Sequence, residues 1–219
     1  MLRKEKYKVK LFKSRISHIK FNDIIEYFPD IIGISVSTWN IKHVLELCTK
    51  IKQFIPEVKI CVGGYAATFY SNEILRNTQE VDYIIRGEGE YAFLNLVRCL
   101  EKQEKLDSVK GLIYKEGQEI ITNENQPFIN NLDDLPFPSR DVLIDNHLNI
   151  ASIESSRGCI GNCSYCSLKK FWIGQTENKK TTFREKTIMR VVDEIEDISK
   201  NLGISRFSFV DASYEINIL

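Results

Sequence analysis

The chain has 219 residues, enough for one large domain or two small ones at roughly 100 to 200 residues per domain. Apolar residues make up 43% and charged residues 27%, a balance that excludes a disordered chain. Thirty Lys and Arg offset thirty Asp and Glu, so no net charge attracts nucleic acid or an anionic membrane. No stretch approaches the roughly 18 to 20 apolar residues of a membrane span, and no signal peptide is evident. We therefore expect a cytoplasmic protein that binds neither nucleic acid nor membrane.

The first part of the chain alternates between strand and helix patterns. Residues 31–37 and 58–64 are apolar runs typical of buried strands, and a third run covers 81–87. An amphipathic pattern predicts a helix over 41–55, which Pro56 ends, and another helix is expected around 68–77. This alternation predicts an α/β domain with right-handed crossovers and a Rossmann-like, doubly wound parallel sheet.

A further helix and a hairpin complete this first domain. Residues 91–100 have helical periodicity, and 111–122 indicate a hairpin that turns at Glu116 and Gly117. The composition then shifts to Asn, Asp and Pro, with three of the five prolines between 127 and 138. We therefore expect the first domain to span 1–122 and a linker to occupy 123–146.

The second domain is expected over 147–219. A short apolar stretch near 149–153 leads into a cysteine-rich loop, and an amphipathic helix follows over 187–202. Gly203 is placed to end this helix in the left-handed conformation, and a strand is expected over 205–210.

The cysteine-rich loop is the most informative feature of the sequence. Cys159, Cys163 and Cys166 lie within eight residues rich in Gly, Asn and Ser, whereas the other three cysteines lie in apolar patterns. Three thiolates at Cys-x3-Cys-x2-Cys spacing favour an iron-sulfur site in which one iron keeps a position for an outside ligand. A zinc site completed by His147, or cysteines that only pack, are the alternatives.

Small and polar residues follow each of the three predicted parallel strands. Parallel sheets bind ligands at the carboxyl ends of their strands, where glycines let the backbone approach a flat or phosphate-bearing ligand. Hydroxyl groups there can donate and accept hydrogen bonds. Taken singly, such residues are more often ordinary tight turns. The candidate binding residues are Ser35, Ser37, Thr38, Gly63, Gly64, Gly87, Glu88, Gly89 and Glu90.

Several ordered motifs resemble one protein family. The loop SSRGCIGNCSYCS is similar to the cluster loop of radical S-adenosylmethionine enzymes. The segments PDIIGIS, VGG, VDYIIRGEGE and LDDLPFPSRD occur in the order seen in the subgroup that carries an N-terminal cobalamin-binding domain. The helix VVDEIEDI and the strand SRFSFVDAS are also similar to that subgroup, so the resemblance covers almost the whole chain.

This resemblance implies a fold, cofactors and site residues. The first domain would bind cobalamin at the strand ends, and the second would be the first part of a radical S-adenosylmethionine (β/α)6 partial barrel. The three cysteines would hold a 4Fe-4S cluster whose free iron binds S-adenosylmethionine, and an electron donor such as flavodoxin or ferredoxin would reduce it. Tyr165 would lie against the adenine, and Asp211 lies near where family members hold the amino group of S-adenosylmethionine. Methyl transfer or C-C bond chemistry would follow.

The sequence also departs from the family pattern. The cobalt-binding motif Asp-x-His-x-x-Gly is absent, and residues 8–12 resemble the second strand of a cobalamin domain rather than its first. Only about two of six barrel strands are expected. We therefore expect a truncated or split form with little turnover alone, which a second chain would complete. The alternatives are a non-catalytic cobalamin or nucleotide module with a small zinc loop, and a nonfunctional remnant.

Overall fold

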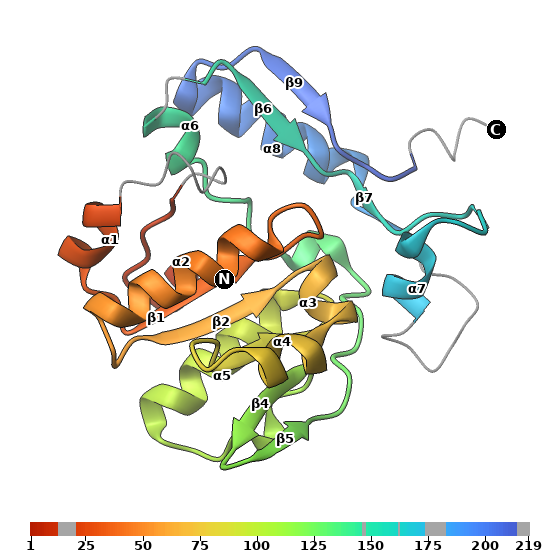
Figure 1. The fold of residues 1–219 in the computed structure, drawn as a ribbon. Helices are drawn as coiled ribbons and strands as arrows, with labels where there is room; N and C mark the ends of the chain where they lie inside the picture. The colour runs from red at the N-terminus through yellow and green to blue at the C-terminus, as the bar shows by residue number, and fades with distance from the viewer. Residues whose placement is uncertain (13–20, 146–147, 162, 174–182, 214–219) are drawn as a thin grey trace. The chain divides into compact units, whose positions relative to one another are not determined.

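The computed structural model describes residues 1–12, 21–145, 148–161, 163–173 and 183–213 (Figure 1). The chain divides into two compact units. One consists of Lys13–Phe128 with Leu2, and the other of Ile129–Leu219 with Met1 and Arg3–Phe12. Within the described ranges, no helix is both long enough and apolar enough to cross a membrane.

The Lys13–Phe128 unit is built on a five-stranded sheet in the order β1-β2-β3-β4-β5. The first three strands are parallel, as predicted, and the hairpin β4-β5 extends the sheet with antiparallel pairing, so the whole sheet is mixed. Its strands are β1 (Ile31–Ser35), β2 (Lys59–Gly63), β3 (Tyr83–Ile85), β4 (Leu112–Glu116) and β5 (Glu119–Thr122).

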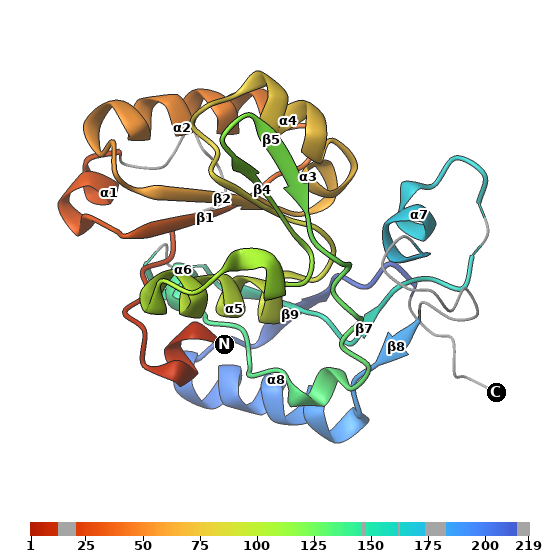
Figure 2. The same ribbon diagram turned by 90° about the horizontal axis from the view of Figure 1, so that it is seen from below.

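Helices cover both faces of this sheet. Figures 1 and 2 show α2, α3 and α4 on one face and α5 on the other. Side chains from alternate strand positions, such as Cys61 and Ile85, pack with Leu96 of α5 in a buried cluster. The helices are α1 (Phe21–Tyr27), α2 (Ile41–Phe54), α3 (Tyr65–Phe69), α4 (Ser71–Asn77) and α5 (Gly89–Lys102), with a 3-10 turn at Leu106–Ser108.

Two elements differ from the prediction. The helix expected around 68–77 is two short helices, because the backbone of Tyr70 leaves the helical region at φ −115° and ψ 27°. Residues 8–12, expected to resemble a strand, have no regular secondary structure. They follow the 3-10 helix Leu2–Glu5 and belong to the other compact unit, where Arg3 donates to the Val9 carbonyl at 2.9 Å.

The Ile129–Leu219 unit is centred on a parallel pair of strands, β6 (Ile150–Ile153) and β9 (Arg206–Phe209). Helix α8 (Ile188–Leu202) packs on this pair through a buried cluster that includes Ile153 and Ile198. The helix begins after Thr187, whose side chain accepts a hydrogen bond from the Arg190 amide, and ends at Gly203, where φ is +68° as predicted. The remaining elements are a 3-10 turn at Leu132–Asp134, α6 (Asp141–Asp145), α7 (Ser167–Ile173) and the short pair β7 (Ser156–Arg157) and β8 (Arg184–Glu185).

The Pro-rich segment predicted as a linker packs into this second unit from residue 129 onward. Ile129, Leu132 and Leu135 are buried. The Arg190 guanidinium of α8 donates to the Leu135 carbonyl and lies 3.8 Å from the centre of the Phe137 ring. These contacts hold the segment against the start of α8.

Candidate functional site

The predicted ligand-binding residues of the first unit gather at one edge of its sheet. Because β1, β2 and β3 are parallel, the turns that follow them all leave from the same edge, which we call the carboxyl edge. Ser35 ends β1 opposite Gly63 at the end of β2. Beyond β1, the Ser37 amide donates to the Asn40 side chain at 2.7 Å, and Thr38 is exposed in the same turn.

At the carboxyl edge, the backbone of Gly64 lies close against the turn that follows β1. Its backbone has φ +92° and ψ −169°, a conformation that is essentially restricted to glycine. A Cβ at this position would lie 3.0 Å from the Val36 carbonyl oxygen and 3.1 Å from the Ser35 Oγ. The close contact between the turns after β1 and β2 therefore requires glycine.

A hydroxyl group joins the turns after β2 and β3. Thr68, in α3, donates to the Gly64 carbonyl at 2.9 Å and accepts from the Gly87 amide at 3.1 Å. Gly87 is buried and has φ +73°. Sequence reasoning did not identify Thr68, although its position one helical turn after a glycine turn is a usable signal.

The turn after β3 is also held by Arg86. Its amide donates to the Gly111 carbonyl at 2.9 Å, and its guanidinium donates to the Asn123 carbonyl at 2.7 Å. Burial lowers the pKa of this guanidinium. Glu88 is 6% exposed, and Gly89 and Glu90 form the start of α5.

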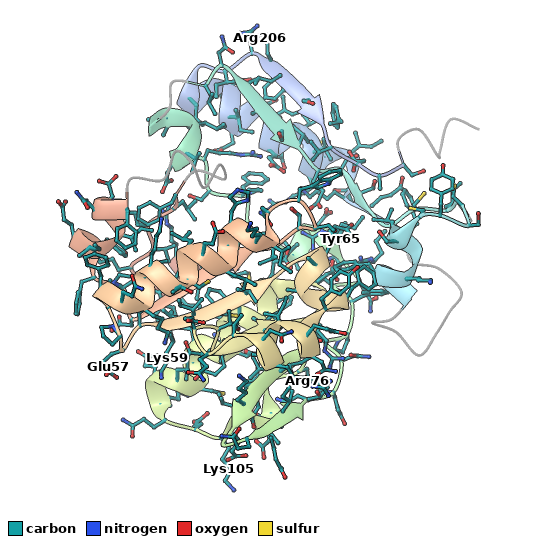
Figure 3. All side chains as sticks on the ribbon, viewed as in Figure 1. Glu57, Lys59, Tyr65, Arg76, Lys105 and Arg206 are labelled. Atoms are coloured by element: carbon teal, nitrogen blue, oxygen red, sulfur yellow. The ribbon has the colours of Figure 1, made fainter. Side chains whose placement is uncertain are left out.

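Aromatic side chains are exposed next to these turns. Trp39, which follows Thr38, is 94% exposed, and Tyr65, which follows Gly64 and is labelled in Figure 3, is 40% exposed. Flat apolar rings beside a turn that requires glycine are suited to a large planar ligand. The carboxyl edge therefore combines close backbone approach, hydroxyl groups and aromatic surface.

The cysteine loop, residues 158–166, lies in the second unit. The Gly161 amide points at the Cys159 sulfur, with 3.3 Å between nitrogen and Sγ. A Cβ on Gly161 would lie 3.3 Å from the Cys159 Sγ and 3.8 Å from the Cys163 Sγ. Two of the three sulfurs thus approach the same glycine, whose N–H is a donor of the kind that tunes cluster potentials.

Cys166 follows one turn later, where its amide donates to the Cys163 carbonyl at 3.2 Å. Cys163 is exposed, and Cys159 and Cys166 are half-buried. Among the described residues, no three Cys, His, Asp or Glu side chains are gathered closely enough to hold a metal ion. Tyr165 is 90% exposed. His147, the alternative zinc ligand, lies outside the described residues.

Asp211 holds the start of the cysteine loop. One of its carboxylate oxygens accepts hydrogen bonds from the Ser155 amide at 2.9 Å, from the Ser156 amide, and from the Ser156 hydroxyl at 2.8 Å. On the other side, the Lys186 amide donates to the Ser155 carbonyl at 2.8 Å. Asp211, predicted near the amino group of S-adenosylmethionine, therefore contacts the backbone that leads into the cysteines.

A buried ion cluster supports the same region. Glu194 of α8 is 1% exposed and pairs with Arg140 and, at 3.0 Å, with Lys186. Arg140 also donates to the Ser152 carbonyl of β6 at 2.9 Å. The cluster therefore ties α8 to β6 and to the strand that returns from the cysteine loop.

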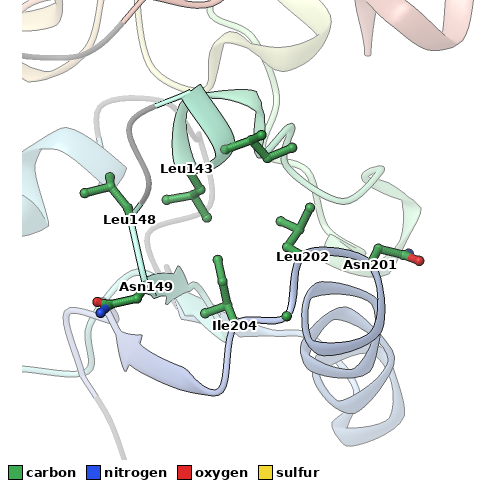
Figure 4. A pocket seen from close by; sticks show the side chains of 8 residues that line it. Leu143, Leu148, Asn149, Asn201, Leu202 and Ile204 are labelled. Atoms are coloured by element: carbon green, nitrogen blue, oxygen red, sulfur yellow. The ribbon is translucent and has the colours of Figure 1, made fainter.

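One hollow of this unit is lined by described residues of which none was predicted to bind a ligand. It lies between α6, the start of β6 and the end of α8, and its lining is mainly aliphatic (Figure 4). The labelled residues are Leu143, Leu148, Asn149, Asn201, Leu202 and Ile204.

Comparison with known proteins identifies relatives of the chain. Residues 1–97 match the B12 binding domain family. An uncharacterized methyltransferase of Pyrococcus horikoshii is 29% identical across 98% of this chain and 47% of its own length. The hopanoid C-3 methylase of Methylococcus capsulatus is 30% identical across 99% of this chain and 42% of its own length.

Solved structures share the fold. OxsB, a cobalamin-dependent S-adenosylmethionine radical enzyme solved with aqua-cobalamin and S-adenosylmethionine bound, superposes with a TM-score of 0.78 and 26% identity over 97% of this chain and 30% of its own. The methyltransferase TsrM of Kitasatospora setae, solved with cobalamin and a [4Fe-4S] cluster, has a TM-score of 0.74 at 17% identity over 99% of this chain and 45% of its own. This chain spans less than half the length of these relatives. Residues 1–97 thus match the B12 binding domain family, and nearly the whole chain is similar to OxsB, a cobalamin-dependent S-adenosylmethionine radical enzyme.

Proposed function

We propose that this chain binds cobalamin at the carboxyl edge and a 4Fe-4S cluster with S-adenosylmethionine at the cysteine loop. Its reaction would be methyl transfer or C-C bond chemistry of the radical type. The observation that carries the proposal is the similarity to OxsB, which runs through both units over 97% of the chain.

The donor types at each site suit these groups, although the sulfurs of the cysteine loop are not gathered closely enough in the described structure to hold a metal ion. Gly64 lets the turns after β1 and β2 contact each other closely, and the exposed Thr38 carries a hydroxyl that can form hydrogen bonds to a nucleotide tail. At the cysteine loop, Cys159 and Cys163 flank a glycine that supplies an N–H donor. Three thiolates leave the fourth iron of a cluster open.

The chain's own groups would bind and orient rather than react. A four-iron cluster with S-adenosylmethionine supplies one-electron cleavage of the sulfonium when bound. Cys159, Cys163 and Cys166 would be its thiolate ligands, and Asp211 would keep the start of their loop in place through Ser155 and Ser156. Tyr165 would cover the adenine. An electron donor such as flavodoxin or ferredoxin would be needed.

Metal analysis after anaerobic reconstitution tests the cluster. We expect about four iron and four sulfide per chain, against one zinc for the rival zinc-loop module. Cys159→Ala, Cys163→Ala and Cys166→Ala should each lose most of the iron, whereas Cys99→Ala, in the core of the first unit, should retain it. A colourless protein that carries zinc would overturn the proposal.

Cobalamin binding is tested separately by titrating hydroxocobalamin and following its visible absorption. Binding should survive in the three loop variants, because the carboxyl edge and the cysteine loop belong to different compact units. Low turnover by this chain alone remains a prediction. The rate of S-adenosylmethionine cleavage, measured with and without candidate partner chains, checks it.

A further inference from the structure

We propose that Thr68 is a positioning residue of the cobalamin site, because its hydroxyl sets the separation of the turns that follow β2 and β3. The inference rests on the proposed cobalamin binding. It concerns a side chain that contacts the two glycine turns rather than one proposed to contact the ligand.

The geometry of the hydroxyl is specific to this role. Its oxygen donates to the Gly64 carbonyl at 2.9 Å and simultaneously accepts from the Gly87 amide at 3.1 Å. The Thr68 amide also donates to the Gly64 carbonyl, at 3.0 Å. A hydroxyl can fill both roles at once because it carries one proton and two lone pairs. The link therefore joins two turns that are 23 residues apart in sequence.

Both turns need such a link. Gly64 and Gly87 have positive φ values of 92° and 73°. Both lie beyond the strands, so the hydrogen bonds between strands do not hold them. Removal of the Thr68 hydroxyl would leave the Gly87 amide without this hydrogen-bond acceptor. Because Gly87 is buried, water does not readily replace it. Arg86 still holds the turn after β3 to Gly111 and Asn123, but without the hydroxyl its direct link to the turn after β2 is lost. A ligand in contact with both turns would then be held less tightly.

Three variants separate the hydroxyl from the bulk of the side chain. Thr68→Val keeps the shape and removes both hydrogen bonds, and Thr68→Ser keeps the hydroxyl. Thr78→Val is the matched control, because the Thr78 hydroxyl makes the same bond to the carbonyl four residues earlier, also at 2.9 Å, but lies after α4 at the amino end of β3.

Hydrogen exchange tests the link without any cofactor. We expect the Gly87 amide to exchange about fivefold to tenfold faster in Thr68→Val, the range expected for one lost hydrogen bond. Thr68→Ser and Thr78→Val should match the wild type at this amide. Equal exchange in Thr68→Val and wild type would overturn the inference. If Thr68→Val does not fold, Thr68→Ala compared with Thr68→Ser isolates the hydroxyl instead.

Cobalamin affinity tests the consequence. Thr68→Val should raise the Kd for hydroxocobalamin by about tenfold, and Thr68→Ser and Thr78→Val should change it by less than about twofold. An unchanged Kd in Thr68→Val would overturn the positioning role even if exchange is faster. A wild-type chain that does not bind cobalamin would instead refute the proposed function, and the exchange experiment would still decide whether Thr68 joins the turns.

Discussion

Replacement of Gly64 by Ala is the sharpest test of the carboxyl edge. At φ +92° and ψ −169°, a residue with a Cβ costs about 1–3 kcal/mol in backbone strain. The added Cβ would lie 3.0 Å from the Val36 carbonyl oxygen, a backbone atom that cannot rotate away, which adds about 1–3 kcal/mol. We therefore expect Gly64→Ala to lower the free energy of unfolding by about 2–6 kcal/mol.

Gly117→Ala is the matched control for this change. Gly117 also has positive φ, +61°, but nothing lies within 4 Å of its added Cβ, so only a left-handed backbone cost of about 1–2 kcal/mol applies. The entropy that Ala removes from the unfolded chain is the same at both positions and cancels in the comparison. The difference in unfolding free energy between the two variants therefore measures the steric clash at Gly64 and the extra cost of its more restricted backbone conformation.

Urea denaturation followed by circular dichroism gives both free energies. Hydroxocobalamin titration should show a raised Kd for Gly64→Ala and an unchanged Kd for Gly117→Ala, because Gly117 lies at the far end of the β4-β5 hairpin. Equal loss of stability in the two variants would refute the steric reasoning. If Gly64→Ala binds hydroxocobalamin with the same Kd as Gly117→Ala, the ligand does not contact the turn at Gly64.

Three further outcomes are expected. Glu194→Leu leaves two partly buried cations, Arg140 and Lys186, without their carboxylate partner and should lower the free energy of unfolding by about 3–5 kcal/mol in urea denaturation; a loss below about 1 kcal/mol would contradict the ion cluster around Glu194. Burial raises the pKa of the Cys48 thiol to about 12, so the folded state favours its neutral form. The free energy of unfolding should therefore fall by at most about 1.4 kcal/mol per pH unit as pH rises from 9 toward 12. In Cys48→Ala this contribution to the pH dependence should be absent. The hydrogen bond from Arg3 lowers the pKa of Asp141. Because the pair is solvent-exposed, Arg3→Ala should lower the free energy of unfolding by less than about 1 kcal/mol at neutral pH, and the part of that loss due to the Asp141 carboxylate should vanish once acid has protonated it in both proteins.

The sequence predicts the elements of both units well where the pattern is local. β1 and β2 follow from apolar runs, α2 from helical periodicity ended by Pro56, and α8 from its apolar face and Gly203. The cysteine spacing and the ordered motifs also indicated the similarity to cobalamin-dependent radical S-adenosylmethionine enzymes. These features depend on residues close together in the chain, so no tertiary contact is needed to recognise them.

Only the tertiary structure decided how distant segments meet. It places the β4-β5 hairpin in the same sheet as the parallel strands, brings the Thr68 hydroxyl between two glycine turns, and packs residues 129–141 with α8. It also turns Asp211 onto the amides that begin the cysteine loop. Composition and periodicity do not encode such contacts, because each depends on the packing of elements that are remote in sequence and on backbone groups that look alike in every residue.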